Sequence, residues 1–193
     1  MIIGISGKSG SGKSKIAEDL AKELGANVIN FDRISHLTIQ TDTFKELVKT
    51  KISTNVFDNN GNIMRKKLGE VVFNDKEKLN LINTCSEKIM CEIIDKLIEE
   101  NKLPYIILEY SLLHLMKYFN MCDFKILVTA KESIRCERVM NRDGISEEYF
   151  ALREKNSPNY IPSLFNTVIE NNTNDDYGLN FLVKTIKQKE NLC

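Results

Sequence analysis

The octet GKSGSGKS at residues 7–14 combines residue types that bind phosphate. It fits the pattern G-x-x-x-x-G-K-[ST], with Gly7, Gly12, Lys13 and Ser14 at the specified positions. Glycines let successive backbone N–H groups turn toward one anion, and a following helix adds the positive end of its dipole. Because a glycine-rich linker can match the pattern by chance, the octet also needs a strand before it and a helix after it.

Both flanking elements are predicted. The apolar run MIIGIS (residues 1–6) is typical of a strand buried on both faces, and GKSKIAEDLAKELG (residues 12–25) has apolar residues at helical spacing up to Gly25, a plausible C-cap. We therefore expect a nucleoside triphosphate, with Lys13 reaching the β and γ phosphates and Ser14 holding Mg²⁺. The expected ATP-binding residues of the octet are Gly7, Lys8, Ser9, Gly10, Ser11, Gly12, Lys13 and Ser14.

Two carboxylates follow predicted strands and should lie at the same edge of a sheet. Asp32 comes directly after NVINF, where it could orient an acceptor hydroxyl and take its proton. The alternative for Asp32 is that it N-caps a helix that begins with FDRISHL. Glu109 ends a strand in the run YIILEYSLL, and because an unpartnered charge there is costly, we expect it to hold Mg²⁺ through a water molecule.

Arginines on a later predicted helix could bind phosphate. Arg138 and Arg142 are four residues apart and face the same side, with Arg135 nearby. The guanidinium fork suits a transferring phosphoryl group, so we expect Arg142 to clamp that group and Arg138 to contact the nucleotide. The alternative is a solvated helix face shared with Glu137.

The alternation of apolar runs with amphipathic stretches predicts an α/β fold. Strands separated by helices pair in parallel through right-handed crossovers, which gives an open five-stranded parallel sheet with helices on both faces. The predicted strands are MIIGIS, ANVINF, LPYIILEY, DFKILVTA and FNTVIENN.

Two intervals are longer than a crossover helix requires. The first contains the helical patterns TDTFKELVKT, RKKLGEVVF and DKEKLNLINTCSEKIMCEIIDKLIEEN, which indicate an inserted helical subdomain. The second turns at Asp143-Gly144, resumes at Ser146 and contains Pro158 and Pro162, which suits a mobile flap. We expect one domain, 1–193, with a core (about 1–34, 103–137 and 164–193), a helical substrate-binding insertion (about 35–102) and a lid (about 138–163).

Composition and charge narrow the class of protein. The 27 basic residues balance the 27 acidic ones, so the electrostatic attraction of a general nucleic-acid binder is missing, and we expect no nucleic-acid partner. The longest apolar run, YIILEYSLLHLM, is shorter than the roughly 20 residues of a membrane span, and no signal peptide is visible. A cytoplasmic protein without a membrane partner is expected.

The remaining motifs favour simple interpretations. DNNG at residues 58–61 matches D-x-x-G, but no N-K-x-D tetrad accompanies it, so we interpret it as a turn and not as a GTPase motif. The five cysteines include no CxxC pair, which favours reduced, mostly buried thiols over a zinc site. His36 and His114 each stand alone and should serve surface or packing roles.

The chain resembles the dephospho-coenzyme A kinase family, P-loop enzymes that phosphorylate the ribose 3′-hydroxyl of dephospho-CoA with ATP. The matching segments are MIIGISGKSGSGKSKIAEDLAKELGANVINFD, GNIMRKKLGEVVFNDKEKLNLIN, ILEYSLL, RVMNRDGISEEYFALR and VIENN. The resemblance implies the three-layer P-loop kinase fold and Asp32 as the catalytic base. It further implies Arg65 in the substrate-binding helical domain, and Arg138, Arg142 and Arg153 in the lid.

The acceptor side and the lid depart from the family pattern. Relative to the family's residues, the chain has Met64 for aspartate, Cys85-Ser86 for His-Pro, Glu109 for aspartate, Ser111 for proline and Ser157 for glutamine. The segment PNYIPSLFNT also contains no Lys or Arg where the family has some. A kinase for another hydroxyl acceptor, such as a nucleoside, and a nucleotide-binding regulatory protein without turnover are the alternatives. The expected acceptor-binding residues are Asp32, Arg65 and Glu109.

Overall fold

A computed structural model describes residues 1–73, 75–173 and 178–190. The chain forms two compact units: Met1–Asn30 with Asn101–Cys193, and Phe31–Glu100. The elements of the first unit are β1 (Ile2–Ser6), α1 (Lys13–Leu24), β2 (Asn27–Asn30), β3 (Ile106–Glu109), α6 (Lys117–Met121), β4 (Phe124–Thr129), α7 (Glu132–Asp143), α8 (Glu147–Lys155), β5 (Thr167–Glu170) and α9 (Leu179–Glu190).

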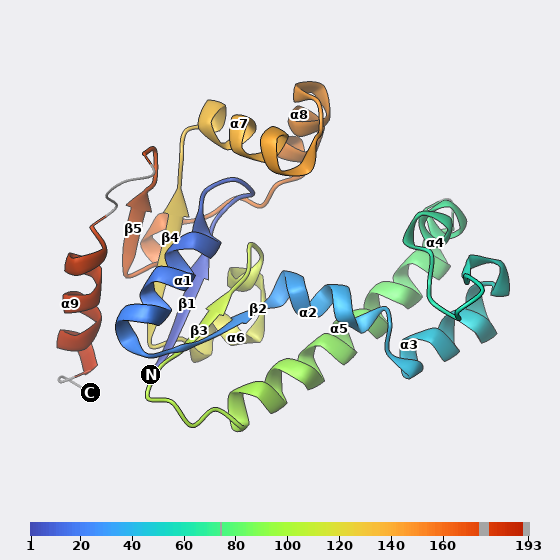
Figure 1. The fold of residues 1–193 in the computed structure, drawn as a ribbon, viewed down its shortest axis with the longest axis horizontal. Coiled ribbons are helices and arrows are strands. Elements are labelled where there is room, and N and C mark those ends of the chain that lie inside the picture. The colour runs from blue at the N-terminus through green and yellow to red at the C-terminus, as the bar shows by residue number, and fades with distance from the viewer. Residues whose placement is uncertain (74, 174–177, 191–193) are drawn as a thin grey trace. The chain divides into compact units, whose positions relative to one another are not determined.

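The sheet of the first unit confirms the predicted α/β fold. Within the described residues it has five strands in the order β2-β3-β1-β4-β5, and every neighbouring pair is parallel (Figure 1). All the strands therefore end at one edge, which we call the carboxyl edge. The carboxyl edge is marked by Ser6, Asn30, Glu109, Thr129 and Glu170.

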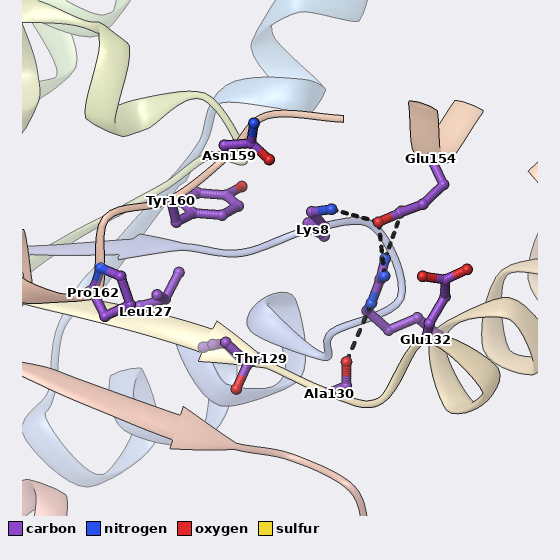
Figure 2. A pocket seen from close by; sticks show the side chains of 11 residues that line it. Lys8, Leu127, Thr129, Ala130, Glu132, Glu154, Asn159, Tyr160 and Pro162 are labelled. Carbon is purple, nitrogen blue, oxygen red and sulfur yellow. Dashed lines mark hydrogen bonds and ion pairs between the residues drawn. The ribbon is translucent and has the colours of Figure 1, made fainter. Parts of the chain in front are cut away.

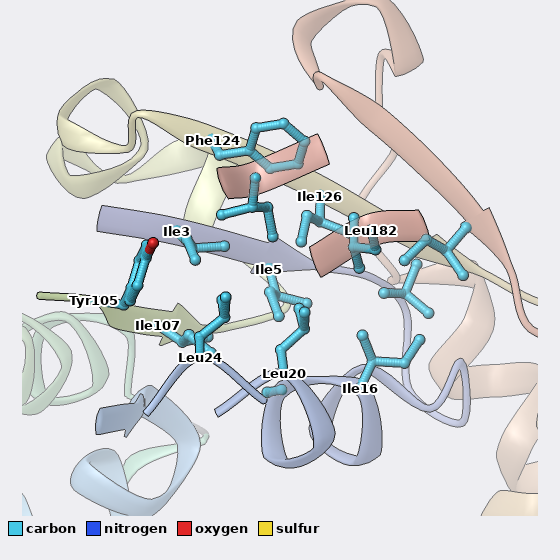
Figure 3. Close-up of a cluster of buried hydrophobic side chains, with 14 residues drawn as sticks. Ile3, Ile5, Ile16, Leu20, Leu24, Tyr105, Ile107, Phe124, Ile126 and Leu182 are labelled. Atoms are coloured by element: carbon cyan, nitrogen blue, oxygen red, sulfur yellow. The ribbon is translucent and has the colours of Figure 1, made fainter. Parts of the chain in front are cut away.

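One face of this sheet is covered by α1 and α9. Ile16, Leu20 and Leu24 project from α1 at helical spacing and pack against side chains of the strands (Figure 3). Leu182 and Ile186 of α9 complete the same buried cluster. As predicted, α1 ends at Gly25, whose φ of 63° is the left-handed conformation that favours glycine. The apolar stripe of α1 therefore fixes the helix that follows the octet against the centre of the sheet.

On the other face, β1 lies very close to Cys122. A Cβ atom at Gly4 would lie 2.6 Å from Cys122 Sγ and 3.0 Å from Leu113 Cδ2, so glycine alone fits there. Cys122 is 4% exposed, and burial raises the pKa of its thiol to about 12. The expectation of mostly buried thiols is wrong for the other cysteines the structure describes, because Cys85, Cys91 and Cys136 are half-buried. Cys193 lies outside the described residues.

The second unit is helical and has its own core. Its elements are α2 (Phe31–Thr38), α3 (Asp42–Leu47), a π-helical turn (Val48–Ile52), a short 3₁₀ helix (Thr54–Val56), α4 (Arg65–Val72) and α5 (Lys76–Glu99). One buried apolar cluster of this unit contains Phe44, Val48, Val56, Ile63, Leu68, Val72 and Ile89. The DNNG segment forms the predicted turn, since the Asp58 carboxylate accepts the backbone N–H groups of Asn60 at 2.9 Å and Asn62 at 2.8 Å.

Candidate active site

The loop between β1 and α1 has the backbone conformation of a phosphate-binding loop. Gly10 (φ 79°) and Gly12 (φ 90°) adopt left-handed conformations that other residues rarely adopt. Gly12 is the N-cap of α1 and provides no side-chain cap. The first helical hydrogen bond runs from the Ile16 N–H to the Gly12 carbonyl at 3.1 Å, so the preceding N–H groups have no partner within the helix. Together with the helix dipole, these groups form a phosphate-binding cradle.

Close contacts also require glycine at these positions. A Cβ atom would lie 2.4 Å from the Val128 carbonyl oxygen at Gly7, and 2.6 Å from the Arg135 carbonyl oxygen at Gly10. At Gly12 it would lie 2.0 Å from Nδ2 of Asn171, which is 6% exposed. Asn171 Nδ2 donates a hydrogen bond of 2.9 Å to the carbonyl of Ser11, so the amide that crowds Gly12 also holds the loop.

We expect Gly12→Ala to destabilise the protein more than Gly25→Ala does. Both glycines have positive φ, but nothing lies within 4 Å of a Cβ atom at Gly25. Gly25→Ala should therefore cost only the backbone strain of about 1–2 kcal/mol, whereas Gly12→Ala adds the overlap with Asn171. Thermal unfolding, monitored by circular dichroism, gives the melting midpoint of each variant. Equal shifts of the melting midpoint would contradict the packing described for this loop.

Glu109 joins three residues at the carboxyl edge. Its carboxylate is 2% exposed and accepts a hydrogen bond of 2.7 Å from Ser14 Oγ. Lys13 Nζ lies 3.8 Å from the same oxygen, and Asn30 Nδ2 donates to the other oxygen. Asn30 was not foreseen from the sequence. Its signal is the strand register, in which Asn30 of β2 lies opposite Glu109 of β3. The costly buried charge is thus fully partnered.

The oxygens at this point suit Mg²⁺. Ser14 Oγ and Glu109 Oε1, a hydroxyl and a carboxylate 2.7 Å apart, are hard oxygen donors. Mg²⁺ is commonly bound by one or two protein oxygens together with substrate phosphates and water. The donor set beside the cradle therefore fits the metal that the sequence predicts.

The predicted arginines of α7 contact the loop of the octet. Arg138 Nη1 donates to the carbonyls of Gly10 at 3.3 Å and Asn171 at 3.0 Å. Arg142 is exposed; its Nη2 lies 3.4 Å from Ser9 Oγ, and its Nε donates to Asp143 at 2.7 Å. Hydrogen bonds from Arg142 lower the pKa of Asp143, so this carboxylate stays ionised beside the arginine. Both guanidinium groups therefore lie at the rim of the cradle.

A second charged group connects the loop to α8, and we call it the Glu154 cluster. Its members are Lys8, Arg135, Glu154 and Ser157. Figure 2 shows Lys8 and Glu154 of this cluster. The Arg135 fork donates to both oxygens of Glu154, at 2.8 and 2.9 Å, and Lys8 Nζ donates to one of them. The side chains of Arg135 and Glu154 are 6% and 14% exposed. Burial raises the pKa of Glu154, but hydrogen bonds from Arg135 and Lys8 outweigh it and lower the pKa to about 2.

Two cavities adjoin the Glu154 cluster. One, of about 410 Å³, is lined by Lys8, Arg135, Glu154 and residues of β4 and of the segment after α8. The other, of about 480 Å³, has Ser9, Ser111 and Leu112 in its wall, together with residues of α7 and α8. Figure 2 shows Lys8 and Glu154 between the phosphate loop and α8. Lys8 and Glu154 therefore line both cavities beside the loop.

The lowered pKa of Glu154 makes the free energy of unfolding depend on pH. A glutamate whose pKa falls from 4.5 to about 2 on folding contributes stability above about pH 5 and loses it as the pH falls toward 2. The contribution is about 3 kcal/mol at most. We expect the melting midpoints of wild type and Glu154→Gln to differ at pH 7 and to converge only as the pH falls to about 2. A difference that stays constant over this range would contradict the ion pairing.

In the second unit, Asp32 and Arg65 lie at the starts of helices. Asp32 is the second residue of α2, inside its first turn, which argues against the N-cap alternative. Arg65 is the first residue of α4, and its Nη1 lies 2.8 Å from Nδ1 of His36. Asp32 and His36 line one hollow on α2 with Arg33. His36 is thus an exposed partner of Arg65, a pairing that its isolated place in the sequence gave no reason to expect.

The chain itself limits how far Asp32 can lie from the carboxyl edge. Asp32 follows Asn30, the last residue of β2, by two residues. Two residues span at most about 7 Å, so chain connectivity keeps the Asp32 backbone within about that distance of Asn30.

A triphosphate cradle at the carboxyl edge of a 2-3-1-4-5 parallel sheet defines a P-loop kinase, and the fold of this chain is of that class. A shikimate kinase from Bacteroides thetaiotaomicron shares this fold at 11% identity, with a TM-score of 0.54 over 99% of this chain and 98% of that one. The family model described as dephospho-CoA kinase matches residues 1–175, so the chain belongs to the dephospho-CoA kinase family, whose members are ATP-dependent transferases of coenzyme A synthesis.

Individual relatives agree with the family model. A dephospho-CoA kinase of Fusobacterium nucleatum is 32% identical over 90% of this chain and 91% of its own length. One of Aquifex aeolicus is 36% identical over 79% of this chain and 78% of its own length. A solved structure from Thermus thermophilus aligns with a TM-score of 0.77 at 26% identity, over 98% of this chain and 97% of that one. In the part of the chain that the structure describes, no helix is long and apolar enough to cross a membrane.

Proposed function

We propose that this chain transfers the γ-phosphoryl group of ATP to the ribose 3′-hydroxyl of dephospho-CoA. The observation that carries the proposal is the buried Glu109 carboxylate, which holds both the lysine and the hydroxyl of the phosphate loop at the carboxyl edge. This arrangement fixes Lys13 and Ser14 before nucleotide arrives, and such preorganisation is how enzymes stabilise charge on a transferring group. Membership of the dephospho-CoA kinase family supports the choice of acceptor.

The octet is proposed to hold the phosphates of ATP through its backbone N–H groups, with Lys13 on the β and γ phosphates. Ser14 would hold Mg²⁺ directly and Glu109 through water. When bound, Mg²⁺ would neutralise charge on the phosphates. Arg142, at the rim of the cradle, is proposed to clamp the transferring group, and Arg138 to contact the nucleotide.

Asp32 is proposed to be the base that takes the proton of the acceptor hydroxyl. Its carboxylate is exposed, and the chain keeps its backbone close to the end of β2. Arg65 is proposed to bind an anionic group of the acceptor, because a guanidinium fork pairs well with phosphate. His36, as a hydrogen-bond partner of Arg65, would steady that side chain.

The predicted division into core (about 1–34, 103–137 and 164–193), insertion (about 35–102) and lid (about 138–163) is retained as part of the proposal. In it the insertion supplies the acceptor side and the lid covers the phosphates, since transfer to an acceptor requires that water be excluded. A cytoplasmic location and the lack of nucleic-acid and membrane partners stay predictions from the sequence.

The decisive experiment compares acceptors. ADP release is measured with dephospho-CoA, with a panel of nucleosides and with no acceptor, and the product is examined by phosphorus NMR. We expect acceptor-dependent ADP with dephospho-CoA and a new phosphate ester at the ribose 3′ position. Turnover with a nucleoside alone would favour a kinase for another acceptor. ATP binding without turnover on any acceptor would favour a regulatory nucleotide-binding protein.

A further inference from the structure

We propose that Glu154 is a positioning residue for phosphoryl transfer, which fastens α8 to the phosphate loop through Lys8 and to α7 through Arg135 (Figure 2). The inference rests on the transfer reaction proposed above. Glu154 is the penultimate residue of α8, and its two cationic partners come from the loop after β1 and from α7. One carboxylate therefore connects three segments that are far apart in the sequence.

Arg135 extends this connection to the backbone around the cradle. Its Nη1 donates to the carbonyl of Ser9 at 3.4 Å, and its Nε donates to that of Ala130 at 3.3 Å. The backbone of Arg135 also lies against Gly10, where a Cβ atom would come within 2.6 Å of the Arg135 carbonyl oxygen. A displacement of Arg135 would therefore disturb the phosphate loop.

Besides this cluster, α8 has one buried apolar anchor. Phe150 is the buried residue of α8, whereas Tyr149 and Leu152 are 53% and 57% exposed. The guanidinium of Arg135 lies 5.8 Å from the centre of the Phe150 ring, so Arg135 contacts both the apolar and the charged anchor of the helix. With so little buried apolar surface, α8 should open locally when the charged anchor is lost.

The charges of the Glu154 cluster explain why loss of this carboxylate should favour hydrolysis of ATP over transfer to the acceptor. The cluster contains two cations and one carboxylate, and Arg135 is 5% exposed. Removal of the carboxylate leaves two neighbouring cations without a counterion, which is strongly unfavourable in a buried site. We expect α8 to move away from Arg135 and water to enter beside the loop, while Lys8 becomes available to the phosphates of ATP. Nucleotide binding should survive, and the protection of the phosphoryl group from water should not.

The test measures whether the phosphoryl group of ATP is transferred to the acceptor or to water. In the full chain at saturating ATP, CoA formation and acceptor-independent ADP release are compared for wild type, Glu154→Gln and the control Glu147→Gln, an exposed carboxylate at the start of α8. In Glu154→Gln we expect the ratio of hydrolysis to transfer to rise about tenfold, with an unchanged or lower KM for ATP. Glu147→Gln should match wild type. A merely structural role would lower both rates together and leave the ratio unchanged, which would overturn the proposal.

A milder variant keeps the proposal testable if Glu154→Gln does not fold. Lys8→Met removes one cation and leaves the Arg135–Glu154 pair intact, so the ratio should rise by a smaller factor, about threefold. An unchanged ratio in Lys8→Met would then overturn the proposal. If wild type forms no CoA from dephospho-CoA, the proposed function fails. If wild type forms CoA but the variants leave the ratio of hydrolysis to transfer unaltered, only the role of Glu154 is overturned.

Discussion

Asp32→Asn should lower kcat for CoA formation by about 10²–10⁴-fold and leave the KM for ATP within about twofold of wild type. Asparagine has nearly the shape of aspartate but does not accept a proton at neutral pH. Because Asp32 is exposed in the first turn of α2, the change should cost the fold little beyond the helix-dipole contribution, about 0.3–1 kcal/mol. The loss should therefore appear in the chemical step and not in nucleotide binding.

A matched control is available in the same unit. Asp42 is an exposed acid in the first turn of α3, so Asp42→Asn makes the same chemical change in a similar helical position. Steady-state kinetics with dephospho-CoA as the varied acceptor should show Asp42→Asn close to wild type. If Asp32→Asn keeps most of its kcat, or if it loses affinity for ATP instead, another group is the base.

Lys13→Ala should weaken ATP binding by about a hundredfold. A charge-assisted hydrogen bond contributes about 1.5–3 kcal/mol, and the upper end of that range corresponds to two decades in affinity. Lys13 is 9% exposed and is already held 3.8 Å from Glu109, so its ammonium group needs little rearrangement to meet the phosphates. Isothermal titration with ATP gives the affinity directly.

Two further variants separate binding from stability. Lys15→Ala removes an exposed lysine two residues away, one that pairs with Asp19 at 2.6 Å, and it should change ATP affinity by less than about twofold. Lys13→Ala also deprives the buried Glu109 of a cation, so it should lower the melting midpoint, and Glu109→Gln in the same chain should recover part of that loss. Unchanged ATP affinity in Lys13→Ala would contradict the phosphate cradle.

The parts of the fold that the sequence predicts are those with local signals. The strand before the octet and the helix after it are set by apolar periodicity. Two helix C-termini, at Gly25 and Gly144, and one N-cap, at Ser146, depend on residues within one turn of each boundary. The octet is predictable for the same reason, because its glycines, lysine and serine are contiguous in the chain.

The contacts that sequence analysis missed depend on tertiary arrangement. Asn30 meets Glu109 only because β2 pairs with β3, and strand order is not encoded in any one segment. Glu154 looks like a surface residue of a helix with weak amphipathic character, and its partners are 19 and 146 residues away. Likewise, the half-burial of Cys85 and Cys91 depends on which side of α5 packs against the rest of its unit.

The tight fit of Gly4 against Cys122 gives the protein an internal reporter of sheet opening. Cys122 is 4% exposed and its Sγ lies against β1 at Gly4, so we expect a thiol reagent to reach it only after the strand separates. The half-buried thiols of Cys85, Cys91 and Cys136 carry no such requirement and should react sooner. Site-resolved labelling by mass spectrometry would therefore time the opening of the central sheet through Cys122. Saturating ATP, by stabilising the folded state, should slow labelling at that cysteine in particular.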